Sequence, residues 1–158
     1  MEELEIAKRR AMHLLGARDY GEKELLDKLR KNYSEETCLT VTGLMAEYGY
    51  IDDERYAKKL AKLYIETRKY GKSRASLMMR QKGLDPETIK EALDFYDSDN
   101  LVSEIAELIR KKYMDRLFIE GLEGKKEVQK VVAALARRGY SYSDIKSALY
   151  IIEDENEE

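Results

Sequence analysis

The triplet Gly83-Leu84-Asp85 has the same pattern of residue types as two other triplets in the chain, Asn32-Tyr33-Ser34 and Gly139-Tyr140-Ser141. Each triplet begins with a residue that tolerates positive φ, continues with an apolar residue and ends with a side chain that can cap a helix. This order is typical of a short turn that ends one helix and starts the next. Three such turns predict that one helical unit is repeated in tandem.

A small or aliphatic residue stands four positions beyond each cap, at Cys38, Ile89 and Ile145. This is where a hydrophobic staple needs its second partner, so these side chains are expected to be buried. Cys38 is the single cysteine of the chain, which excludes an internal disulfide and favours a packing role over a chemical one.

The composition favours helix nearly throughout, because 39% of the 158 residues are charged and only one is proline. Apolar residues at helical spacing predict helices in three groups of three. Their expected ranges are 2–17, 22–31, 35–48, 53–69, 72–82, 86–96, 100–116, 125–138 and 142–152. A longer, partly ordered connection is expected over 115–124.

The predicted fold is therefore all-α: a tandem array of three three-helix, helix-turn-helix-like repeats that form an elongated, curved molecule. The repeats are expected at 1–50, 51–98 and 99–152, followed by an acidic tail at 153–158 that is expected to be disordered. The residues expected to cap or end helices are Asn32, Ser34, Gly49, Asp52, Asp53, Gly83, Asp85, Gly139 and Ser141.

Candidate chemistry is sparse. The trio Asp52-Asp53-Glu54 could hold Mg²⁺, but carboxylates at the start of a helix are better explained as caps. The chain has no Cys/His ligand set, no phosphate-binding glycine loop and no nucleophile with a paired base. We therefore expect a binding protein, not an enzyme, with no metal and no cofactor. The absence of a long apolar run and of a secretory signal predicts a cytosolic protein with no membrane partner.

Charge is segregated although the net charge is only −3. Residues 55–84 contain ten basic residues and one acidic residue, a net charge of +9, whereas residues 85–107 contain eight acidic residues and one basic, a net charge of −7. Lysines on a helix usually form a solvated face, but this excess exceeds what solubility needs and favours an anionic partner. The predicted basic face comprises Arg55, Lys58, Lys62, Arg68, Lys69, Lys72, Arg74, Arg80, Lys82, Arg137 and Arg138.

Three stretches, in the same order along the chain, resemble the three repeats of the RecX family, the bacterial regulators of the RecA recombinase. The stretch 49–57, with Gly71, Arg74 and 80–84, resembles the middle repeat. The stretch 135–142 is similar to the third repeat and 17–29 to the first, so the resemblance covers roughly residues 10 to 150.

The resemblance implies a modular helical protein that binds RecA filaments on DNA along their groove and restrains ATP hydrolysis, strand exchange and repressor cleavage. DNA would be contacted weakly or through the filament, and the protein would be a monomer. Three departures from the family pattern bear on individual contacts: Gly21 replaces a hydroxyl residue, Asn32 replaces glycine, and 71–75 is less rich in arginine.

Two rival interpretations remain. Three-helix units resemble DNA-binding modules, so the chain could bind nucleic acid independently of RecA. It could also be a helical scaffold for another protein.

Overall fold

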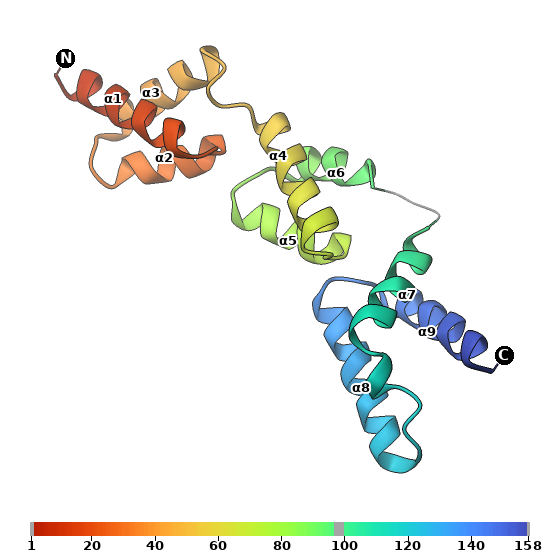
Figure 1. The fold of residues 1–158 in the computed structure, drawn as a ribbon. Helices are drawn as coiled ribbons and strands as arrows, with labels where there is room; N and C mark the ends of the chain where they lie inside the picture. Colours follow the sequence, from red (N-terminus) through yellow and green to blue (C-terminus); the bar gives the residue numbers. More distant parts are fainter. Residues whose placement is uncertain (1, 97–99, 158) are drawn as a thin grey trace. The chain divides into compact units, whose positions relative to one another are not determined.

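The structure, a computed structural model, describes residues 2–96 and 100–157 (Figure 1). No strand occurs among these residues, which confirms the all-α prediction. The described residues form nine α-helices joined by turns: α1 (Glu2–Ala17), α2 (Glu22–Arg30), α3 (Glu35–Glu47), α4 (Asp53–Lys62), α5 (Lys72–Gln81), α6 (Pro86–Asp94), α7 (Leu101–Lys112), α8 (Gly121–Arg137) and α9 (Tyr142–Glu157). The expected repeat boundary at residue 98 lies outside the described residues.

The chain forms two compact units, and their boundaries do not follow the three-helix groups. One unit comprises Met1–Leu63 with Ser76–Leu93, and the other comprises Tyr64–Ala75 with Asp94–Glu158. The middle group of helices is thus divided: its two ends, 53–63 and 76–93, belong to the unit of the first group, and its inner segment 64–75 belongs to the unit of the third group.

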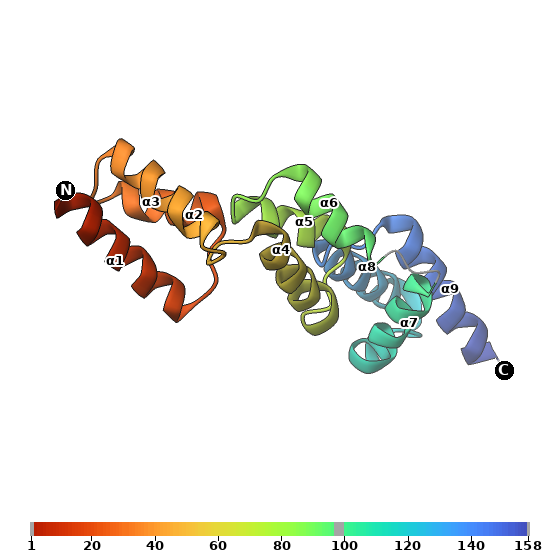
Figure 2. The same ribbon diagram turned by 90° about the horizontal axis from the view of Figure 1, so that it is seen from above.

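The first and third groups share one packing plan. In each, the first and third helices pack side by side, α1 against α3 and α7 against α9, as the view in Figure 2 also shows. Apolar residues at helical spacing form the two cores. The first core comprises Ala7, Ala11, Leu14, Tyr20, Leu25, Leu29, Cys38, Val41, Met45 and Ile51. The other comprises Ile105, Ala106, Leu108, Ile109, Leu117, Val131, Leu135, Ile145, Ala148 and Ile152.

Three glycines end helices in the left-handed region. Gly49, Gly83 and Gly139 have φ values of 80°, 86° and 99°. Asn32 does not share this role, because its φ is not positive. The backbone after α2 turns instead through bonds from the Asn32 and Tyr33 N–H groups to the Leu29 carbonyl. This turn needs no left-handed residue, so asparagine can stand where the family pattern has glycine.

Side chains cap the helices that follow these turns. Ser34 accepts a hydrogen bond from the Thr37 N–H, Asp52 from Arg55, Asp85 from Thr88, and Ser141 from Asp144. The hydrogen bonds from Thr88, first of all that from its backbone N–H, lower the pKa of Asp85. Each cap satisfies one of the free amides at a helix start.

Asp53 caps a different helix from the one that was expected. Gly21 is the N-cap residue of α2, but it has no side chain that could accept from the free amides of the first turn. The Glu24 carboxylate reaches back to the Gly21 N–H, at 3.1 Å. Asp53 Oδ1 accepts the next free amide, that of Glu22, at 2.9 Å. Asp53 therefore completes the cap of α2 from the first turn of α4, and both lie in the same compact unit.

Helix ends differ from expectation by more than two residues in three regions. The helix expected over 53–69 ends as α4 at Lys62 and continues as a π-helical turn over Leu63–Thr67. The 115–124 connection is shorter than expected, because it contains a 3₁₀ turn at Met114–Arg116 and because α8 already begins at Gly121. Gly124 permits this early start, since it lets α8 pack against the Ile119 carbonyl. The segment 153–157, expected to be disordered, continues α9 to Glu157, where Arg110 Nε donates to Glu155 at 3.1 Å.

Thr42 offers a test of the first core. Its side chain is 3% exposed, and its hydroxyl has no hydrogen-bond partner within the described residues. Because an unpaired buried hydroxyl is destabilising, Thr42→Val should raise the free energy of unfolding by about 1 kcal/mol, as measured by urea denaturation. A lower stability would mean that the hydroxyl has a partner.

Candidate functional site

The turn before α5 lies against the turn after α8 inside one compact unit. The Gly71 N–H donates to the Arg138 carbonyl at 2.6 Å. A Cβ added to Gly71 would overlap the Gly139 carbonyl group, and a Cβ added to Gly139 would lie 2.5 Å from the backbone nitrogen of Arg74. The two backbones therefore touch directly, and we call residues 68–74 with 137–140 the domain junction.

Two arginines of the predicted basic face hold this junction. Arg74 Nη1 donates to the Arg137 carbonyl at 3.1 Å, and Arg138 Nη1 donates to the Arg68 carbonyl at 3.0 Å. These carbonyls lie at or just beyond helix ends, where the regular helical partners run out. Arg74 and Arg138 thus cross-link the two turns, and at least part of their hydrogen-bonding capacity is used inside the protein.

Tyrosines complete the junction. The Tyr140 hydroxyl donates to the Lys69 carbonyl at 2.7 Å, and burial raises the pKa of Tyr140, which keeps the phenol protonated. The Arg74 guanidinium lies 4.2 Å from the centre of the Tyr70 ring, which is stacked on Tyr64 with 6.0 Å between centroids. Sequence reasoning placed Tyr140 only as the apolar residue of its turn and did not predict that these rings meet; the only further signal was that Tyr70 and Tyr140 each adjoin a turn glycine.

Lys69 has an unexpected backbone role. It lies two residues after the π-helical turn and has a φ of 57°, a conformation that is uncommon for lysine. Its carbonyl accepts from Tyr140 and, at 3.3 Å, from Arg138. These two bonds, together with the bond from Arg138 to the Arg68 carbonyl, fix the backbone of the turn. They therefore fix the direction in which the exposed Lys69 side chain leaves it.

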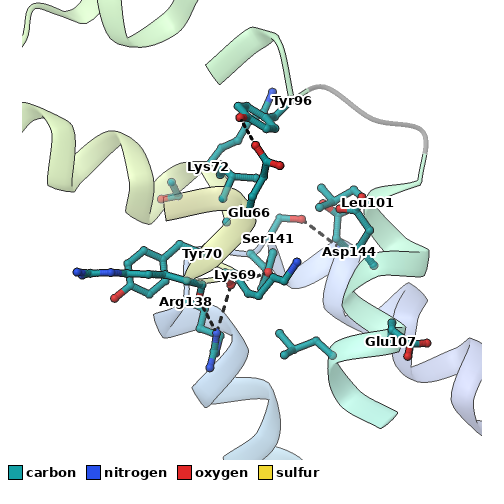
Figure 3. Close-up of a pocket in the computed structure, with 18 of the residues that line it drawn as sticks. Glu66, Lys69, Tyr70, Lys72, Tyr96, Leu101, Glu107, Arg138, Ser141 and Asp144 are labelled. Atoms are coloured by element: carbon teal, nitrogen blue, oxygen red, sulfur yellow. Dashed lines mark hydrogen bonds between the residues drawn. The ribbon is translucent and has the colours of Figure 1, made fainter. Parts of the chain in front are cut away.

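A hollow of about 1060 Å³ lies beside the junction in the same unit (Figure 3). Four residues of the predicted basic face line it: Arg68, Lys69, Lys72 and Arg138. Two lysines not included in that face, Lys111 and Lys112 of α7, line it too, together with four acids: Glu66, Glu104, Glu107 and Asp144. The hollow therefore carries both charges, and it is not the uniformly basic groove that the +9 segment suggests.

Aromatic and apolar groups form the rest of this hollow. The Tyr96 hydroxyl donates to Glu66 at 2.8 Å, as Figure 3 shows, and burial together with this bond raises the pKa of Tyr96 to about 12. Phe95 is 84% exposed at the rim and meets Tyr96 edge to face. Aromatic rings are enriched in protein-binding surfaces, whose rims are polar.

The other predicted basic residues lie elsewhere. Arg55, Lys58 and Lys62 are exposed at one-turn intervals along α4, in the other compact unit. Their side chains form no ion pair within the described residues, whereas the neighbouring Lys59 pairs with Asp19 at 2.8 Å. We call these three residues the α4 stripe. Arg80 lies in the last turn of α5 and Lys82 directly after that helix, both in that same unit, and Arg137 is exposed at the end of α8.

Among the described residues, no group of three or more His, Cys, Asp or Glu is placed to hold a metal ion. None of the described helices is both long and apolar enough to cross a membrane. What the residues build is a set of surfaces: a basic stripe, a mixed-charge hollow and a tightly locked junction. These features define a modular helical-repeat protein suited to binding a large partner.

Comparison with known proteins shows to which family of helical-repeat proteins this chain belongs. The second three-helix domain of RecX matches residues 52–93, the third matches 103–149 and the first matches 7–41. The protein named Regulatory protein RecX of Clostridium acetobutylicum is 32% identical over 155 residues, covering 95% of this chain and 70% of its own length. This chain belongs to the RecX family of regulatory proteins.

Further relatives and solved structures agree. Regulatory protein RecX of Clostridioides difficile is 30% identical over 90% of this chain and 66% of its own length, and that of Bacillus subtilis is 28% identical over 94% and 56%. The chain thus spans about half to two thirds of the length of most of these relatives. The crystal structure of RecX from Lactobacillus salivarius shares the fold, with a TM-score of 0.84 at 21% identity over 96% of this chain and 97% of that one. A second RecX crystal structure has a TM-score of 0.73 at 24% identity, over 91% and 71%.

Proposed function

We propose that this chain regulates the RecA recombinase by binding the RecA–DNA filament. It restrains ATP hydrolysis, strand exchange and coprotease activity, and so regulates DNA repair and the SOS response. The observation that carries the proposal is membership of the RecX family, with all three three-helix domains matched in order. RecA as the partner comes from the family resemblance.

The surfaces described above fit this role. The exposed α4 stripe offers cations to a filament that contains DNA. The hollow offers aromatic rings and both charges, which suits a protein surface better than a bare polyanion. In this proposal the protein works in the cytoplasm as a monomer, by binding and without catalysis. DNA is contacted weakly or through the filament.

Single-stranded-DNA-dependent ATP hydrolysis by the RecA of the same organism tests this function. Titration of this protein should inhibit hydrolysis at well below one molecule per RecA, because an extended binder acts on filament growth or along a groove. No effect at any ratio, with the protein shown to be folded by circular dichroism, would reject the proposal.

A second candidate is nucleic-acid binding independent of RecA, and the unpaired cations of the α4 stripe favour it. It predicts tight binding to DNA alone, with log K falling against log salt by about 0.7 to 0.9 per phosphate neutralised. A flat salt response measured by fluorescence anisotropy would exclude it.

A further inference from the structure

The third domain differs from the first two in its second helix and in the connection that leads to it. Helix α8 has 17 residues, whereas its counterparts α2 and α5 have 9 and 10. The connection before α8 spans 113–120, against 18–21 before α2 and 68–71 before α5. The first domain closes a three-helix core without this extra chain, so its presence in the third domain suggests a role beyond domain folding.

Exposed apolar side chains gather on this extra chain. Met114, Phe118, Ile119 and Leu122 are 38%, 44%, 45% and 76% exposed, and we call them the apolar cap. Figure 1 shows their segment as the loop at the end of α8 away from the α8–α9 turn. Single exposed apolar residues are ordinary on protein surfaces, but four within nine positions indicate an interaction site.

The apolar cap is held firmly. Leu117, in its middle, is buried in the core of the third domain. Arg116 Nε donates to Glu127 of α8 at 2.9 Å, and Gly124 lets α8 pack directly against the Ile119 carbonyl. Phe118 is kept at a φ of 65°, which a bulky residue rarely adopts. A surface fixed in this way loses little conformational entropy when it binds.

The charges around the apolar cap disfavour a polyanion. Asp115, Glu120 and Glu123 are exposed and pair with no other described side chain, while Arg116, the one base among residues 114–123, is paired with Glu127. The nearest lysines flank this segment, Lys111 and Lys112 before it and Lys125 and Lys126 after it. DNA phosphates or an anionic membrane would meet the three carboxylates beside the apolar residues. The pattern instead complements an apolar protein groove with basic groups at its rim.

We propose that the apolar cap inserts into an apolar, basic-rimmed groove on the RecA protein. This proposal rests on the proposed function and adds to it which surface contacts protein instead of DNA. The third domain thereby supplies a rigid apolar anchor, the kind of contact that dominates the energy of protein interfaces.

The test is a variant that makes the cap polar without straining it. Phe118→Asn, Ile119→Ser and Leu122→Ser are combined, because asparagine tolerates a positive φ and the other two side chains are exposed. The matched control combines Ile6→Ser and Leu39→Ser, which are 51% and 53% exposed in the first domain. Binding of wild type and variants is measured separately to RecA without DNA, to RecA filaments and to single-stranded DNA.

The apolar-cap variant should bind RecA and its filaments at least tenfold more weakly, with unchanged affinity for DNA and unchanged helicity. The Ile6 and Leu39 control should bind like wild type. Replacing Glu120 and Glu123 by lysine should also weaken RecA binding, since these charges would then oppose a basic rim.

Other outcomes overturn the proposal, each in a distinguishable way. Unchanged RecA binding by the apolar-cap variant, with wild type binding well, rejects the cap but leaves the proposed function intact. Lost DNA binding would make the cap a nucleic-acid wedge, and a wild-type dimer that the variant abolishes would make it a self-association surface. A wild-type protein that does not bind RecA at all rejects both proposals.

Discussion

Replacing Gly139 by alanine should lower the free energy of unfolding by about 2–5 kcal/mol. Two costs combine, because Gly139 has a φ of 99° and its new Cβ would lie 2.5 Å from the Arg74 nitrogen. A left-handed residue with a Cβ costs about 1–2 kcal/mol, and overpacking typically adds about 1–3 kcal/mol. Backbone atoms form the obstacle, so a side-chain rotation cannot relieve it. Urea denaturation followed by circular dichroism measures the effect.

Other glycines in the chain separate these two costs. Gly49 has a φ of 80° with open space around it, so Gly49→Ala should show the conformational cost alone, about 1–2 kcal/mol. Gly71→Ala should show the steric cost alone, about 1–3 kcal/mol, because its φ is not positive and its Cβ would overlap Gly139. Gly43 lies within α3 with no neighbour in reach, and Gly43→Ala should stabilise by about 0.5–1 kcal/mol.

The order of these four effects is what tests the domain junction. If Gly139→Ala cost no more than Gly49→Ala, the two turns would not touch in solution as described. A stable Gly71→Ala protein with unchanged unfolding would contradict the junction in the same way.

The helices themselves could be predicted from the sequence because their signals are local. A turn glycine, a capping side chain one turn before a free amide and apolar residues at helical spacing all act within a few residues of one another. For this reason α1 begins at Glu2 and ends at Ala17 as expected, and α5 and α6 start where Gly71 and Asp85 indicate. The end of α9 was misjudged because a distant contact, Arg110 with Glu155, decides it. The start of α8 was misjudged because it depends on the close fit of Gly124 under the Ile119 carbonyl, which helical spacing alone does not reveal.

The candidate site was harder to predict for the same physical reason. Charge counting identified a basic segment, but it could not show that Arg74 and Arg138 donate to backbone carbonyls across the junction. It likewise could not separate the α4 stripe from Lys69 and Lys72, because their assignment to two compact units depends on tertiary packing. Asp53 shows the same limit: its place in the sequence predicts a cap of α4, and its contact with Glu22 makes it a cap of α2.

Reversing the charge of the α4 stripe should abolish most of the inhibition of RecA. The variant combines Arg55→Glu, Lys58→Glu and Lys62→Glu, which places three carboxylates where the proposed filament complex needs cations. Facing like charges cost several kcal/mol at an interface, so about tenfold or more of the protein should be needed for half-inhibition of ATP hydrolysis. The three side chains are exposed and unpaired within the described residues, so the unfolding transition should stay unchanged.

The choice of residues is what makes this result interpretable. A variant at Lys72, Arg74, Arg80 and Lys82 would also reverse basic charges, but Arg74 holds the domain junction, so lost inhibition could reflect lost folding. The matched control is Arg9→Glu, Lys28→Glu and Lys31→Glu, the same change of charge on exposed residues of α1, of α2 and directly after α2, all outside the predicted basic face. The control should inhibit like wild type, and raising the salt concentration should weaken wild type more than the α4-stripe variant. Equal loss in both variants would mean that net charge alone drives the association, and full inhibition by the α4-stripe variant would remove this stripe from the binding surface.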